Sequence, residues 1–218
     1  LTETLSGASS AGVRSDGVAR STSSVLTSQR MAAGSDAAQA SVMASAWSSL
    51  SARLGDTTDG SGLFAMMSRM ESAFATAAET PESAANLSAI IDSATALLGE
   101  FRSLSQYVAS ERLEADQEIA KGVETVNNAL KSIEALNIKI ASSDRTTSGA
   151  ASLMDERQRY VDTISEYLPI ETVDRAGGQI DIVTREGVYL LAGKARELEF
   201  PQTSGFGPND TLAGGELS

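Results

Sequence analysis

The feature that most constrains this chain is the long interval without proline between Pro81 and Pro169. Proline disrupts helix interiors, so its absence here leaves room for a very long helix. We expect this helix to start with Thr80 as its N-cap and Pro81 in its first turn, and to run to about Ser142. At 1.5 Å per residue, about sixty residues form a rod of roughly 90 Å.

Apolar residues in the second half of this interval recur at alternating steps of four and three, which is typical of a coiled-coil contact. A reversal at 144–149 and a shorter helix over about 152–168 follow, and we expect that helix to fold back on the rod as the return arm of a hairpin. The apolar contact residues of the two helices are called the seam: Ile119, Val123, Val126, Leu130, Ile133, Ile140, Leu153, Tyr160, Val161 and Ile164. Asn137 also holds a seam position, where it either sets the register or lies near an open end.

Two further helices are predicted before the rod, at 24–54 and 63–78, with a polar loop at 55–62 between them. The apolar spacing in the second helix predicts a buried face made of Phe64, Met67, Met70 and Phe74. Near the start of the chain, Asp16-Gly17 predicts a tight turn between two short extended pieces.

After Pro169 the apolar residues alternate with a period of two, which indicates strands at 170–173, 179–183, 188–192 and 197–200. The short loops between them favour an antiparallel meander. The predicted fold class is therefore α+β, mainly α: a long helical hairpin or bundle followed by a small antiparallel β meander. We expect an elongated helical core with an N-terminal extended or hairpin segment at 1–168, a small β subdomain at 169–200, and a loop leading out at 201–218.

Composition excludes several kinds of chemistry. The chain has no cysteine and no histidine, so it has no disulfides, thiol nucleophiles or Ser-His-Asp triad. Its net charge of −12 disfavours nucleic-acid and membrane partners. Carboxylates at Glu111, Glu114 and Glu118 follow one side of the rod and are interpreted as a solvated face. We predict no catalytic residue, no cofactor and no metal ligand.

Three stretches, in this order along the chain, carry a resemblance: AGVRSDGVARSTSSVLTSQ (11–29), a helical block at 61–105 with a proline near its middle, and LMDERQRYVDTISEYLPIETV (153–173). They resemble the flagellar hook-associated protein 1 family, the first of the bacterial hook–filament junction proteins. In the third stretch, Asp155 and Arg157 match a Leu-Asp-Gln-Arg-Asp-like segment of the family, whereas Glu156 and Gln158 depart from it.

The resemblance implies a structural part of the flagellum, not an enzyme. Such a protein has no cleavable signal, leaves the cell through the flagellar type III channel, and assembles outside the cell as a ring. The implied partners are other copies of itself, the hook protein, the next hook-associated protein or flagellin, and an export chaperone that binds a terminus expected to be missing here. The family's core is completed by a returning C-terminal helix. We therefore expect part of the seam to lack its partner in this chain.

Three other interpretations stay open at this point. Flagellin and hook-associated protein 3 are also axial proteins with helical cores, although the sheet predicted after Pro169 fits them less well. A helical surface adhesin or secretion-tip module also suits a long hairpin. An accessory hydrolase is the enzymatic alternative, since the sequence leaves a Ser–Lys dyad open.

Overall fold

The structure, a computed structural model, describes residues 23–55, 60–143, 148–203 and 205. The predicted turn at Asp16-Gly17 lies outside these residues, as do parts of the 55–62 loop, the 144–149 reversal and the 201–218 segment. Four helices come first: α1 (Ser24–Leu54), α2 (Gly62–Glu79), α3 (Ala84–Ser142) and α4 (Ser148–Tyr167). A small antiparallel sheet follows them, which confirms the predicted fold class.

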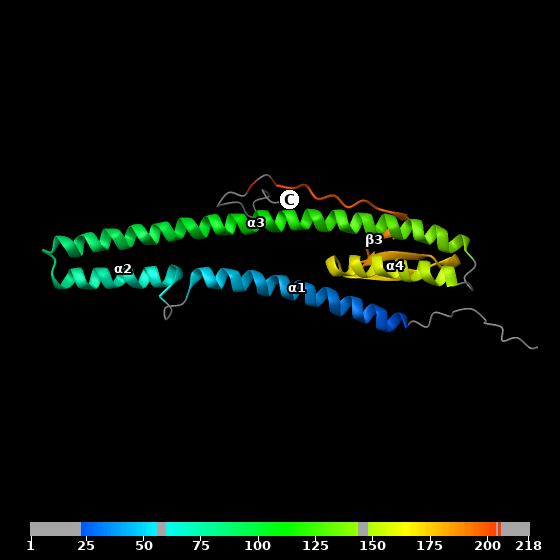
Figure 1. Cartoon of the computed structure of the whole chain (residues 1–218), viewed down its shortest axis with the longest axis horizontal. Helices are drawn as coiled ribbons and strands as arrows, with labels where there is room; N and C mark the ends of the chain where they lie inside the picture. The colour runs from blue at the N-terminus through cyan, green and yellow to red at the C-terminus, as the bar shows by residue number, and fades with distance from the viewer. Residues whose placement is uncertain (1–22, 56–59, 144–147, 204, 206–218) are drawn as a thin grey trace, which may run out of the picture.

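Figure 1 shows α3 as the longest element, with α2 and α1 following one another along its length. The 59 residues of α3 make a rod of about 89 Å. At one end of the rod, α4 lies between α3 and α1 and contacts both. This arrangement holds α1 away from α3.

The predicted start of the long helix was wrong by a few residues. Its N-cap is Ser83, whose Oγ accepts a hydrogen bond from Asn86 N at 3.4 Å. Thr80 instead ends α2, and its Oγ1 accepts from Asn86 Nδ2 at 2.6 Å. Pro81 lies in the turn between the two antiparallel helices, where its fixed φ suits the reversal.

Three of the four residues predicted for the buried face of α2 were wrong, because each was placed one residue away from the real face; Met70 is half-buried and belongs to both. Phe64, Met67 and Phe74 are 43%, 47% and 52% exposed. The buried and half-buried residues at steps of three and four are instead Leu63, Met66, Met70, Ala73 and Ala77. Small alanines allow α2 to approach α3 closely, so the close-packed face is not the one with the largest side chains.

Two substitutions test which face of α2 is buried. Leu63→Ala should lower the free energy of unfolding by about 2 kcal/mol or more, because Leu63 is only 8% exposed. Phe64→Ala removes a larger side chain but should cost less than about 1 kcal/mol, because exposed substitutions have small effects. Urea unfolding of the two variants checks the ranking, and a larger loss for Phe64→Ala would contradict the assignment.

The sheet has the order β1-β2-β3-β4, with β1 at Ile170–Asp174, β2 at Ile180–Thr184, β3 at Tyr189–Ala192 and β4 at Lys194–Ala195. All pairings are antiparallel, so the first three predicted strands and the meander are confirmed. The fourth predicted strand, 197–200, was wrong. Those residues leave the sheet and run along α3, because side chains of α3 hold their backbone.

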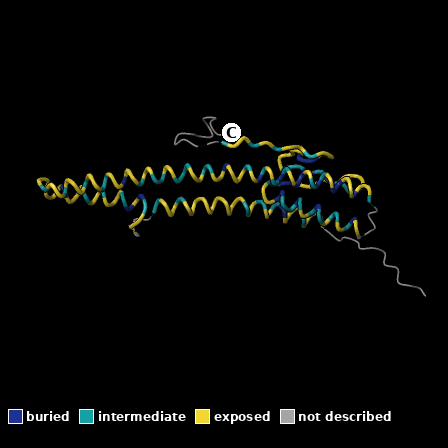
Figure 2. Tube along the Cα trace, turned by 45° about the horizontal axis from the view of Figure 1, so that its top comes forward, coloured by how far each residue is buried: buried dark blue, intermediate teal, exposed yellow. Residues whose placement is uncertain are grey.

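One hydrophobic core joins α1, α3, α4 and the sheet. It contains Met31 of α1 together with residues of α3, α4 and three strands, including Leu130, Val161, Ile182 and Leu191. Figure 2 shows the buried residues gathering at the α4 end, whereas the α2–α3 hairpin is mostly exposed or half-buried. The domain boundaries at 168 and 200 stay a prediction.

Candidate functional site

The seam has a covered part and an open part. In the covered part, α4 packs against the second half of α3. Six seam residues there are at most 1% exposed: Val126, Leu130, Ile133, Ile140, Val161 and Ile164. Leu153 and Tyr160 are half-buried beside them.

Asn137, the polar residue of the seam, lies at a buried junction of α3, α4 and the sheet. Its Nδ2 donates to Ile180 O at 2.7 Å, and its Oδ1 accepts from Ile180 N at 3.2 Å. Arg157 of α4 donates from Nη1 to Asn137 Oδ1 at 2.9 Å and to Gly178 O at 2.7 Å. The Asn137 amide therefore pairs with the sheet as a backbone group would, and Arg157 connects this pair to α4.

The open part of the seam begins where α4 ends. Tyr167 is the last residue of α4, and Pro169 follows two positions later. The Tyr167 ring lies against the buried Gly122, because a Cβ added to Gly122 would be 3.0 Å from Tyr167 Cδ1. Beyond this contact the seam residue Val123 is half-buried and Ile119 is 50% exposed.

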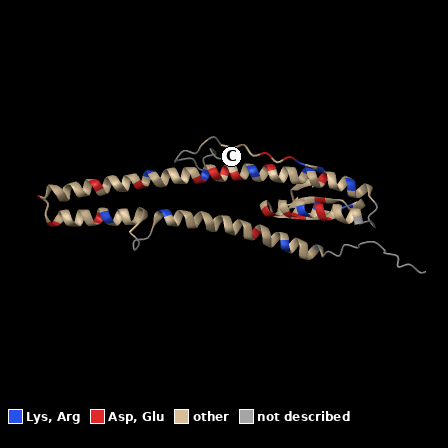
Figure 3. Ribbon diagram, in the orientation of Figure 1, with Lys and Arg blue, Asp and Glu red and all other residues tan. Residues whose placement is uncertain are grey.

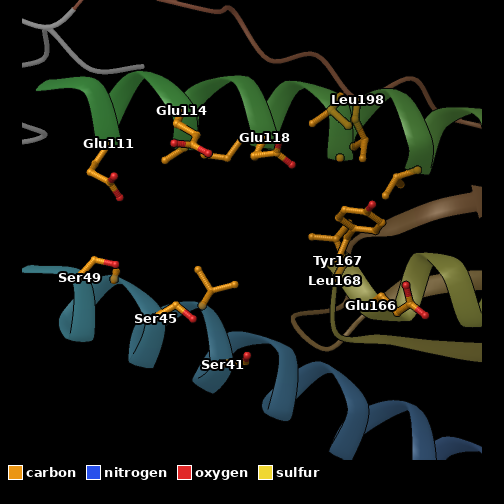
Figure 4. Close-up of a pocket in the computed structure, with 17 residues that line it drawn as sticks. Ser41, Ser45, Ser49, Glu111, Glu114, Glu118, Glu166, Tyr167, Leu168 and Leu198 are labelled. Atoms are coloured by element: carbon orange, nitrogen blue, oxygen red, sulfur yellow. The ribbon is translucent and has the colours of Figure 1, made fainter. Parts of the chain in front are cut away.

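A groove of about 830 Å³ lies along this open part, between α1 and α3. Apolar side chains from both helices and from the end of α4 line it: Val42, Ala46, Ile119, Val123, Val126, Tyr167 and Leu168. Leu198, from the segment after the sheet, adds to the same end. Figure 4 shows Tyr167 and Leu168 at this end, with the two helices as the facing walls.

The rim of the groove is acidic on one side and neutral on the other. Glu111, Glu114 and Glu118 follow the α3 wall, and Ser41, Ser45 and Ser49 follow the α1 wall at four-residue steps. Figure 3 shows that α1 carries few charged residues. An apolar floor between a carboxylate row and a serine row is a surface suited to an amphipathic helix with a basic flank.

One of the rim carboxylates already has a basic partner. Lys121 Nζ lies 2.6 Å from Glu118 Oε1. This hydrogen bond, with the negative charge of Glu118, raises the pKa of Lys121 above its usual value. Because both side chains are exposed, the pair contributes little to stability. Glu111 and Glu114 are also exposed, as the sequence predicted, but they border a groove.

The α1 wall is a residue set that sequence reasoning missed. Every residue from 41 to 49 is exposed, although this stretch includes Val42, Met43 and Trp47. The seam was the one sequence signal for the groove, because its apolar residues on α3 continue beyond the end of α4. α4 holds the 41–49 stretch of α1 away from α3, and the sequence of α1 carries no signal of that separation.

The described residues contain no group of three or more acidic side chains placed to hold a metal ion. No described helix combines the length and the apolar character needed to cross a membrane. Every buried polar side-chain atom in the described part has a hydrogen-bond partner. The groove itself is an apolar surface between two helices, bordered on α3 by three glutamates.

Comparison with known proteins identifies relatives of this chain. The family model described as flagellar hook-associated protein FlgK helical domain matches residues 47–215. Flagellar hook-associated protein 1 of Escherichia coli (strain K12) is 25% identical over 205 residues, which is 93% of this chain and 37% of that protein. The protein of the same name from Salmonella typhimurium is 27% identical over 128 residues, covering 57% of this chain and 23% of its own length.

A solved structure has the same fold. The flagellar hook junction protein FlgK from Burkholderia pseudomallei aligns with a TM-score of 0.66 and 19% sequence identity, over 76% of this chain and 29% of that one. This chain thus spans 37% or less of the length of these relatives.

Proposed function

The chain belongs to the family of flagellar hook-associated protein FlgK, and from this membership we propose that it is the helical part of a junction protein that connects hook to filament. It acts mechanically, and it turns over no substrate. The protein is exported by flagellar type III secretion without a cleavable signal and assembles outside the cell as a ring. Its partners are like subunits, the hook protein, and the next hook-associated protein or flagellin. An export chaperone binds another part of it.

The rod and its packing support this role. A single helix of 59 residues, braced at one end by α4 and a sheet that share one core with it, is a stiff element. The curated relatives reported above are named flagellar hook-associated protein 1, which favours this function over flagellin, hook-associated protein 3 or a surface adhesin. The polar residues of the groove do not converge on one point: the three glutamates of α3 face the serines of α1 across it, and Glu166 and Tyr167 lie at the α4 end (Figure 4).

The single observation that carries the mechanism is the open part of the seam. Ile119 and the exposed α1 stretch at 41–49 border an apolar groove next to the part of α3 that α4 covers. A helix from the remainder of the protein fills this groove and completes the core, with basic residues on its flank facing Glu111 and Glu114. The greater length of the relatives supports this occupant, because more than half of the Escherichia coli protein lies outside the match.

Ile119→Asp separates this docking from folding. Because Ile119 is 50% exposed, the variant of this chain should melt within about 2 °C of the parent, as expected for a surface substitution. In the full-length protein the same change puts a charge under the docked helix and should abolish swarming of a complemented null strain. The measurements are a thermal melt of the chain and a swarm-plate assay.

Ile138→Asp is the matched control, because Ile138 is a 61% exposed isoleucine on α3 that does not line the groove. It should leave both the melt and the swarming unchanged. Wild-type swarming of the Ile119→Asp strain would contradict the docking proposal. Immunogold labelling of the wild-type protein tests the function itself: label at the hook–filament junction supports it, and label over the cell body supports a surface adhesin instead.

A further inference from the structure

The segment that leaves the sheet at β4 is attached to α3 by three side chains that bind its backbone and by one ion pair between side chains, Lys131–Glu197. Glu134 Oε2 accepts from Ala195 N at 2.8 Å, and Asp116 Oδ2 accepts from Thr203 N at 3.1 Å. Between them, Asn127 binds both backbone groups of Leu198: Oδ1 accepts from Leu198 N at 2.9 Å, and Nδ2 donates to Leu198 O at 2.8 Å. Residues 195–203 are called the strap.

The spacings on the helix and on the strap match. From Glu134 to Asn127 the helix rises about 10.5 Å, and from Asn127 to Asp116 about 16.5 Å. The corresponding strap intervals, Ala195 to Leu198 and Leu198 to Thr203, extend about 9.9 Å and 16.5 Å at 3.3 Å per residue. These spacings agree with a strap that runs extended along α3 with little slack between its anchors. Steps of seven and eleven residues are close to whole turns, which puts the three anchors on one face of α3.

We propose that the strap is a taut tie that passes tension from the residues after 203 to α3, with Asn127 as its central anchor. A chain with little slack transmits a pull, and force along the rod loads all three anchors in shear. Two hydrogen bonds meet at Asn127, whereas one meets at each end anchor. The Lys131–Glu197 ion pair is exposed on both sides and adds little.

The three anchors bind backbone groups of the strap and not its side chains, so at these points spacing decides its position on α3. At its start the strap is also fixed by the sheet, through the pairing of Ala195 with Leu191 and the hydrogen bond from Arg196 N to Leu190 O. The side chains of Ala195 and Leu198 pack against the core, and Leu198 also lines the groove. The strap therefore joins three parts at one residue: the sheet it leaves, the rod that holds it, and the end of the docking groove.

Asn127→Leu tests the anchor, because leucine keeps the size of the side chain and removes both hydrogen bonds. Site-resolved hydrogen exchange of the 218-residue chain should show the Leu198 amide exchanging roughly tenfold faster or more. The amides of Ala195 and Thr203 should also exchange faster, since the anchors share one taut segment. Asn128→Leu is the matched control: Asn128 is the exposed neighbour and should change none of the three rates.

A pulling experiment reads the mechanical role directly. The substitutions Lys139→Cys and Gly205→Cys provide two attachment points in a chain that has no other cysteine. Lys139 is exposed, and a Cβ at Gly205 meets nothing within 4 Å. Pulling between them loads the strap along α3. We expect release at a clearly lower force in Asn127→Leu than in Asn128→Leu.

Two results would overturn the inference: a Leu198 amide in the unaltered chain that exchanges as fast as unstructured peptide, or equal release forces in the two variants. The inference rests on the proposed structural role, because a tie matters only in a part under force. The two fail separately, however. Strap exchange does not depend on Ile119, and swarming of the Ile119→Asp strain does not depend on Asn127.

Discussion

Replacing Leu130 with aspartate is expected to unfold the core at its centre. Leu130 is 0% exposed in a cluster shared by α3, α4 and the sheet. A carboxylate there has no basic partner in the cluster, and burying it should cost about 4 kcal/mol or more. For a chain of this size, that loss lowers the melting temperature by roughly 8–16 °C. A thermal melt followed by circular dichroism measures it.

Ala135→Asp is the matched control for this change. It places the same new side chain on the same helix, at an exposed position five residues further along. We expect it to cost less than about 1 kcal/mol. Equal melting temperatures for the Leu130→Asp variant and the parent would defeat the assignment of this residue to the seam.

The second large effect is expected at the polar junction. Asn137→Leu fits the volume of the site but takes two hydrogen bonds from Ile180 and one acceptor from the buried Arg157. The backbone N–H and C=O of Ile180 and the guanidinium of Arg157 then lose this partner, which should lower the free energy of unfolding by about 3–5 kcal/mol. Urea unfolding measures the loss, and hydrogen exchange at the Ile180 amide locates it.

Two further variants sharpen this result. Asn128→Leu, on the exposed side of α3, should leave the unfolding midpoint close to that of the parent. Arg157→Ala, combined with Asn137→Ala, should cost less than the sum of the single changes, because the two side chains share one hydrogen bond. Additive losses would show that the junction does not act as a unit.

Much of the helical architecture could be predicted because it follows from local pattern. The bounds of α1 matched the expected 24–54, and α3 ended at the expected Ser142. The first three strands appeared where the period of two begins. Errors arose where two local solutions compete. Ser83 and Thr80 are both good N-caps, and the turn around Pro81 decided between them.

The α2 face and the strap show the other limit. Two apolar stripes run along α2 one residue apart, and only the approach of α3 selects the one with alanines. Residues 197–200 alternate as a strand does, but Asn127 on α3 provides the partner for Leu198 in place of a neighbouring strand. An amide on a helix that pairs with an extended backbone leaves no periodic signal in the sequence.

By itself, the sequence determined the long helix, the return arm and the sheet, because each depends on the spacing of apolar residues and on where prolines stop a helix. Only the tertiary structure decided the groove and the strap. The groove exists because α4 ends at Tyr167 and holds α1 at a distance from α3. The strap can bind α3 at three anchors because the distances between the anchors along the helix match the distances between the bound residues along the extended chain. This match becomes visible only when the two segments lie side by side in the structure.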